Sequence, residues 1–179
     1  MRVRWTLVVG LAGLLACDVP GAPAWTADYV FPLDYPSVDL SGFPGGVIPS
    51  GTVTFDTPVE TQDVVGLVEQ VLTDSALNAL TAEVVTDATV DVTGSVVVSI
   101  ATNPANLFSA TNAVTVTVPF SQTVDTTTAP INVNLLRTGG TLYFQSRVTV
   151  SGGAGGTPVG SGSEIGIGLN LFANVQVSK

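Results

Sequence analysis

Apolar and polar residues alternate over most of the chain after residue 83. From Val84 to Ile100 the even-numbered positions are nearly all apolar, whereas most odd-numbered positions are Asp, Thr or Ser. Successive side chains of a β-strand point to opposite faces, so this pattern predicts strand with one buried face. These seventeen residues would reach about 56 Å as one strand, beyond the roughly 36 Å diameter of a compact domain of this length. The segment therefore bends at Gly94 or turns there through a three-residue loop at 93–95, and the absence of Asn-Gly and Asp-Gly pairs favours the bend.

The same alternation predicts further strands at 51–55, 113–120 and 164–177. A β-hairpin is predicted around Gly139-Gly140, because this pair suits a two-residue turn and keeps apolar residues on one face. In that hairpin Leu135 faces Phe144, and Ile131 faces Val148. Residues 152–162 are rich in Gly and Ser and are expected to form a flexible loop. The inward positions of the last strand are Ile165, Ile167, Leu169, Leu171, Ala173, Val175 and Val177.

One stretch, at about 58–80, has helical rather than alternating spacing. Thr57, Pro58 and Glu60 fit a capping box, with a hydroxyl cap, Pro at the first helical position and Glu three residues after the cap. Apolar residues then recur at helical spacing up to Leu72, and Asp74 is a second candidate cap. The pattern predicts one helix or two short ones in this stretch.

About seven antiparallel strands and one helical segment make the expected fold mainly β, an antiparallel β-sandwich. The stretch "VSIATNPANLF", through Asn103-Pro104 at a strand exit, resembles late-embryogenesis-abundant type 2 domains. That resemblance implies a small β-sandwich of a kind also found in bacterial lipoproteins, and it implies no site residue.

The N-terminus has the features of an export signal. Arg2 and Arg4 precede an uncharged apolar run that is shorter than the roughly 20 residues needed to span a bilayer. The run ends in Leu14-Leu15-Ala16-Cys17, which resembles the lipobox of bacterial lipoproteins. The resemblance implies that residues 1–16 are a cleaved signal peptide and that Cys17 carries a diacylglyceryl thioether. It places the protein on a membrane of the bacterial cell envelope, outside the cytoplasm, with inner and outer membrane both open.

Residues 17–46 are expected to be the lipidated N-terminus and a tether rich in Pro and Gly, and residues 47–179 the β-sandwich domain. Within the tether, Trp25, Tyr29, Phe31 and Tyr35 suggest that the later part docks onto the domain as an edge strand. Because Cys17 is the single cysteine, the chain has no disulfide framework.

Charge excludes some partners. Cleavage before Cys17 leaves three basic and fourteen acidic residues, a formal balance of 3 − 14 = −11. Such a chain repels nucleic acid and anionic lipid headgroups, so nucleic-acid binding is not expected. The oligomeric state stays open.

Candidate chemistry is sparse. The chain has no histidine, which excludes His-based triads and the common zinc sites, and no cofactor motif. Glu83 and Asp87 lie four residues apart, as do Asp87 and Asp91; this is about 13 Å on a strand, beyond the 5–9.5 Å typical of glycosidase carboxylates. Asp56, Glu60 and Asp63 match no calcium loop, and the glycines of 152–162 lack the Lys-Ser/Thr of a phosphate-binding loop. We therefore expect no catalytic, metal or cofactor site, and Cys17 is the one assigned site.

These observations favour a non-enzymatic, lipid-anchored envelope protein with a binding or structural role. Its partners would be the membrane, through the lipid, and another envelope protein. The alternative is a carrier that holds an apolar ligand in a cavity between sheet and helix, beneath residues 64–80.

Overall fold

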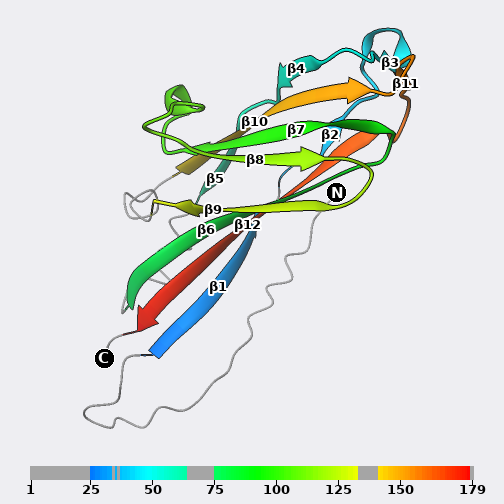
Figure 1. The fold of residues 1–179 in the computed structure, drawn as a ribbon. Helices are drawn as coiled ribbons and strands as arrows, with labels where there is room; N and C mark the ends of the chain where they lie inside the picture. Colours follow the sequence, from blue (N-terminus) through cyan, green and yellow to red (C-terminus); the bar gives the residue numbers. More distant parts are fainter. Residues whose placement is uncertain (1–24, 34, 36, 64–74, 133–140, 178–179) are drawn as a thin grey trace, which may run out of the picture.

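Two antiparallel sheets, packed face to face, form most of the protein (Figure 1). The computed structural model describes residues 25–33, 35, 37–63, 75–132 and 141–177. Sheet I has the strand order β1-β12-β6-β9, with β2 also beside β12. Sheet II has the order β4-β10-β7-β8, with β5 also beside β10, and β3 pairs with β11 at one end. The strands are β1 (Trp25–Leu33), β2 (Val38–Asp39), β3 (Val47–Ile48), β4 (Val53–Asp56), β5 (Glu60–Asp63), β6 (Ser75–Ala88), β7 (Val92–Ala101), β8 (Val114–Phe120), β9 (Asp125–Ile131), β10 (Thr141–Gly152), β11 (Thr157–Pro158) and β12 (Glu164–Val177); two short 3-10 turns are η1 (Pro44–Gly46) and η2 (Pro104–Asn106).

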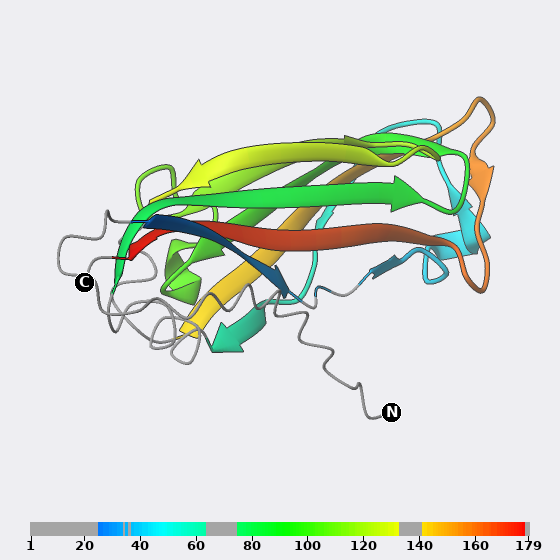
Figure 2. The same cartoon turned by 90° about the horizontal axis from the view of Figure 1, so that it is seen from below.

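The mainly β fold and the antiparallel sandwich are thus as predicted. The strands expected at 51–55, 113–120 and 164–177 are β4, β8 and β12. The inward residues of β12 from Ile165 to Val175 are all buried, as the alternation requires. Figure 2 shows β12 and β6 running along the length of the sandwich. The space between the sheets is filled by aliphatic residues and Phe from both, including Leu80, Val84, Val96, Val98, Val118, Phe144, Val148 and Leu169.

The break in the alternating segment 84–100 does not lie at Gly94. Residues 89–91 connect β6 of sheet I to β7 of sheet II, and Gly94 is inside β7. Both expected arrangements, the bend and the loop at 93–95, are therefore wrong. A three-residue connection preserves the parity of the buried positions, from Ala88 to Val92, while the chain crosses from one sheet to the other. Such a crossing does not require the Asn-Gly or Asp-Gly pair of a tight hairpin.

The predicted hairpin around Gly139-Gly140 is also wrong where it can be compared. Ile131 pairs with Leu80 in sheet I, whereas Val148 pairs with Val96 and Phe55 in sheet II. Leu135 and the two glycines lie outside the described residues. The strand β10 has β7 on one side and β4 and β5 on the other, so β9 has no free edge of β10 to join.

The predicted helix at 58–80 is replaced by strand at both ends, since 60–63 are in β5 and 75–80 are in β6. Residues 64–74 lie outside the described part. From Ser75 onward the chain pairs with β12 through thirteen residue pairs, with one bulge near Asn174. This long edge supplies backbone partners that outweigh the local helical spacing. The alternative of a ligand cavity between sheet and helix required a helix over 64–80, and residues 75–80 of that stretch are strand instead.

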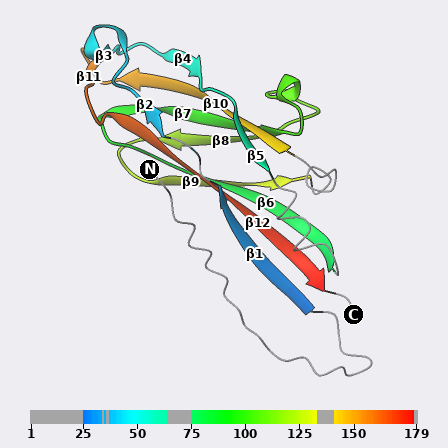
Figure 3. The same cartoon turned by 180° about the vertical axis from the view of Figure 1, so that it is seen from behind.

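The segment from Trp25 belongs to the sandwich. All nine residues of β1 pair with β12, at the outer edge of sheet I (Figure 3). The expected edge strand is present, and the domain boundary expected at residue 47 falls inside the fold. Residues 152–162, expected to be a flexible loop, contain β11, and the Thr157 hydroxyl donates to the Asp91 carbonyl at 2.6 Å. Within the described ranges, no helix is long and apolar enough to cross a membrane.

Candidate functional site

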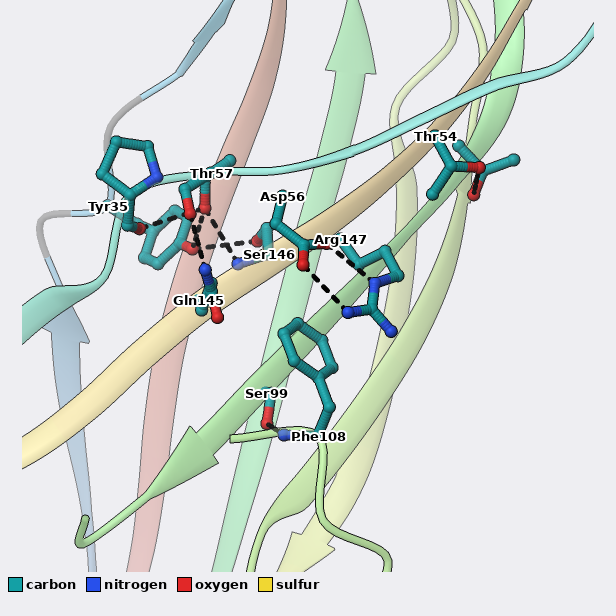
Figure 4. A network of polar contacts seen from close by, with 11 residues as sticks. Tyr35, Thr54, Asp56, Thr57, Ser99, Phe108, Gln145, Ser146 and Arg147 are labelled. Atoms are coloured by element: carbon teal, nitrogen blue, oxygen red, sulfur yellow. Dashed lines mark hydrogen bonds and ion pairs between the residues drawn. The ribbon is translucent and has the colours of Figure 1, made fainter. Parts of the chain in front are cut away.

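The most organised group of polar side chains lies along β10 (Figure 4). On the outer face of sheet II, Arg147 and Asp56 are direct partners across the β10–β4 pair. Arg147 donates from Nε to Oδ1 of Asp56 at 2.7 Å and from Nη2 to Oδ2 at 2.9 Å. Arg147 is the one basic residue in the described part of the chain. Two parallel hydrogen bonds hold the plane of its guanidinium in one orientation.

Phe108 supports the guanidinium from the loop between β7 and β8. Its ring centre lies 4.3 Å from Cζ of Arg147, within cation–π distance. Its backbone N–H donates to Oγ of Ser99 at 2.8 Å, and Ser99 is fully buried although it lies one residue from the inward-facing Val98. Phe108 has a φ of 60°, the one positive φ of a non-glycine residue in the described ranges. The Ser99 hydrogen bond and the ring contact therefore hold a residue in a strained conformation, and they fix the loop on sheet II.

A second, buried group lies on the opposite face of β10. The Tyr35 hydroxyl donates to Oγ of Ser146 at 2.9 Å. Thr57, between β4 and β5, exchanges two hydrogen bonds with the Ser146 backbone: Thr57 N donates to Ser146 O at 2.8 Å, and Ser146 N donates to Thr57 Oγ1 at 3.0 Å. Gln145, on the same face of β10 as Arg147, donates from Nε2 to the Thr57 carbonyl at 2.8 Å. Because Tyr35 comes from the link between β1 and β2, this network ties the edge of sheet I to the edge of sheet II.

The pKa values of these groups favour fixed hydrogen bonds over proton transfer at neutral pH. The hydrogen bonds from Arg147 lower the pKa of Asp56, so both partners stay charged at neutral pH. Burial raises the pKa of Tyr35 above its usual value, so its hydroxyl stays protonated and able to donate. In Figure 4, the remaining terminal nitrogen of the Arg147 guanidinium points away from Asp56.

Cys17 is the one predicted site residue, and the carboxylates Glu83, Asp87 and Asp91 are not assigned to a site. Cys17 lies outside the described residues. Glu83 accepts a hydrogen bond from Asn170, Asp87 lies against Gly166, and the Asp91 carbonyl accepts from Thr157. In the described ranges no three Asp, Glu, Cys or His side chains form a group that could hold a metal ion.

Sequence reasoning missed Tyr35, Phe108, Ser146 and Arg147 as members of a site. Arg147 carried one available signal, since it is one of few cations and sits at an outward position of an alternating strand. The contacts of Tyr35 and Phe108 join residues from loops to distant strands, and no local pattern indicates them.

Comparisons with known proteins add little. No family model matches the chain, and no curated protein matches it. Among solved structures, the chain is similar to a protein of Desmodium yellow mottle tymovirus, with 12% identity, coverage of 93% of this chain and 94% of that chain, and a TM-score of 0.43. The strand pairings themselves define the protein as an antiparallel β-sandwich.

Proposed function

We propose that this is a lipid-anchored protein of the bacterial cell envelope with a non-enzymatic binding or structural role. The observation that carries the proposal is the sequence Leu14-Leu15-Ala16-Cys17 at the end of a short apolar run, with its resemblance to a lipobox. Two acyl chains on Cys17 would anchor the protein stably, since each buried methylene contributes about 0.8 kcal/mol.

The position of β1 suits such an anchor. Trp25 follows Cys17 by eight residues, which span at most about 29 Å when fully extended. The beginning of β1, where Trp25 pairs with Val177, would therefore stay close to the bilayer. Because β1 is an edge strand, a tether can leave it without passing through the core.

A binding or structural role fits the polar groups that the fold organises. Arg147, Asp56 and Tyr35 each serve as a partner in a fixed hydrogen-bond network. The pKa of Asp56 is lowered and that of Tyr35 is raised, so neither group changes its protonation near neutral pH. The absence of histidine in the sequence removes the commonest general base.

The test is the substitution Cys17→Ser, followed by membrane fractionation of the producing cells. We expect the protein to move from the membrane pellet to the soluble fraction, because the acidic chain has no basic patch to replace the lipid. The matched control is Asp18→Ser, which introduces the same residue into the tether and should remain in the membrane fraction.

An uncleaved variant could stay in the membrane through its apolar signal. The experiment therefore includes a version of Cys17→Ser in which residues 1–16 are replaced by a signal for ordinary signal peptidase, with cleavage checked by intact mass. A cleaved Cys17→Ser protein that still pellets in high salt would show that something other than the lipid holds it, and the proposed anchor would be wrong.

A further inference from the structure

An apolar row crosses the outer face of sheet I. Val30 of β1, Phe172 of β12 and Thr81 of β6 are direct cross-strand partners, and Pro130 of β9 pairs with Thr81. Val30 is 54% exposed and Phe172 is half-buried, on a face that carries both polar residues and the apolar residues Pro32 and Val85. Phe172 is the aromatic centre of this row, on the strand with neighbours on both sides.

Two carboxylate–amide pairs border the row, one on each side of Phe172 along β12. Asn170 donates from Nδ2 to Oε1 of Glu83 at 2.9 Å, and Asn174 donates from Nδ2 to Oδ1 of Asp28 at 2.6 Å. Glu83 lies on β6 and Asp28 on β1, so the two carboxylates stand on opposite sides of β12. We call Asp28, Val30, Thr81, Glu83 and Phe172 the Phe172 patch.

The negative charge of the patch has no counterpart in the described part of the chain. The one ion pair there joins Arg147 and Asp56, on the outer face of the other sheet. The amide groups orient one oxygen of each carboxylate but neutralise neither charge. Phe is enriched at protein interfaces relative to the rest of the surface. The patch thus combines an apolar anchor point with two negative charges.

The geometry points to the partner. Residues 170 and 174 of β12 are about 13 Å apart along the strand, and β1 and β6 are about 10 Å apart across it, so Asp28 and Glu83 lie about 16 Å apart on the diagonal. In an extended segment, side chains at positions i, i+2 and i+4 share one face, and their Cα atoms span about 13 Å. Long Lys or Arg side chains at the two ends cover the remaining distance to carboxylates about 16 Å apart. We propose that the Phe172 patch docks an extended segment of a partner protein with Lys or Arg at two positions four residues apart and an apolar side chain midway between them.

Charge argues against other occupants. A second copy does not fit, because Arg137, Arg147 and Lys179 of the mature chain are all at least ten residues apart. Anionic lipids and nucleic acids would meet two carboxylates and no cation. Docking of the peptide does not require the lipid anchor. Failure of the peptide to bind would therefore leave the proposed lipid anchoring untouched, and failure of the anchoring would leave the docking untouched.

The test uses the full mature protein in non-ionic detergent and a fluorescent peptide with the central sequence Thr-Lys-Thr-Phe-Thr-Lys-Thr, with binding followed by fluorescence anisotropy. We expect saturable binding that weakens as salt rises, since exposed charges are screened within about 10 Å at 0.1 M salt. Peptides with Glu in place of both Lys, or Thr in place of Phe, should bind at least tenfold more weakly.

Variants locate the binding on the patch. Phe172→Thr should weaken binding at least tenfold, and so should Asp28→Asn combined with Glu83→Gln, which keeps an oxygen to accept from each Asn but removes both charges. The matched controls are Val97→Thr, a half-buried outward residue of sheet II, and Asp91→Asn, an exposed acid outside the patch. They should leave the affinity unchanged. The proposal is overturned if the Lys peptide does not bind, if the Glu peptide binds as well, or if the controls weaken binding as much as the patch variants do.

Discussion

Gly94 lies inside β7, where the backbone of β10 passes too close for any side chain. Gly94 pairs with Val150 of β10 on one side and with Phe120 of β8 on the other. A Cβ at this position would overlap the Thr149 carbonyl oxygen and lie 2.8 Å from Cζ of Phe120. We predict that Gly94→Ala destabilises the protein, because the obstructing oxygen belongs to the backbone of a strand with neighbours on both sides and cannot rotate away.

Gly166 provides a matched control for the same substitution. It lies inside β12, and a Cβ there would overlap Oδ1 of Asp87 by a similar amount. Asp87 is exposed, so its carboxylate can rotate into solvent. Both variants are Gly→Ala in the interior of a long strand, and they differ in whether the obstacle is backbone or the end of a flexible side chain.

The magnitudes follow from that difference. Forcing extra atoms into a packed site costs about 1–3 kcal/mol, and a backbone obstacle places Gly94→Ala near the upper limit. Reduced freedom of the unfolded chain offsets about 0.4–1 kcal/mol in both variants. We therefore expect Gly94→Ala to lower the free energy of unfolding by about 2 kcal/mol, or the melting temperature by about 4–8 °C. Gly166→Ala should stay within about 0.5 kcal/mol of the parent protein.

Urea unfolding of the cleaved Cys17→Ser protein and of both variants in that background measures the effect as a shift in midpoint at constant slope. The reasoning is refuted if Gly94→Ala is no less stable than Gly166→Ala. A changed slope for Gly94→Ala would mean that the variant alters the unfolded or native ensemble, and the comparison would then be made by thermal unfolding.

Two further predictions concern the network along β10. Tyr35→Phe should cost about 1–2 kcal/mol by removing the hydrogen bond to buried Ser146, and the cost should nearly vanish in a Ser146→Ala background; equal costs in both backgrounds would contradict the pairing. Burial raises the pKa of Tyr35, so the folded protein holds this proton more tightly than the unfolded chain does. The resulting contribution to the free energy of unfolding is complete below about pH 10 and is lost as the pH rises through the pKa of the folded state. This alkaline loss of stability should be absent from Tyr35→Phe. Arg147 lowers the pKa of Asp56, so that contribution is present above about pH 4 and is lost as pH falls through the lowered pKa. Asp56→Asn should therefore flatten the acid side of the stability profile measured by urea unfolding, and an unchanged profile would show that the exposed pair adds no stability.

The sequence by itself determined the long strands after residue 83 and most of their buried positions. Alternation along 164–177 identified the inward residues of β12, and the same period marked most of the buried positions from Val84 to Ile100; Val90 and Gly94 are half-buried, and Ser99 is buried at an odd position. These features follow from the two-residue period of a strand, which is a local property of the chain. The aromatic residues after Trp25 likewise indicated a docked edge strand.

Tertiary structure alone decided which strands pair. The buried residues fall at even positions whether residues 84–100 form a bent strand, a three-residue hairpin or a crossing between sheets. The pattern therefore could not show that β6 and β7 lie in different sheets. The Gly-Gly pair satisfied every local condition for a hairpin, yet β10 is already paired on both edges by β7, β4 and β5. The contacts of Arg147 with Asp56 and Phe108 depend on those pairings, because each joins segments that are far apart in the chain. Local sequence sets the period of an element, whereas its partners depend on competition among all the strand edges and apolar faces of the folded chain.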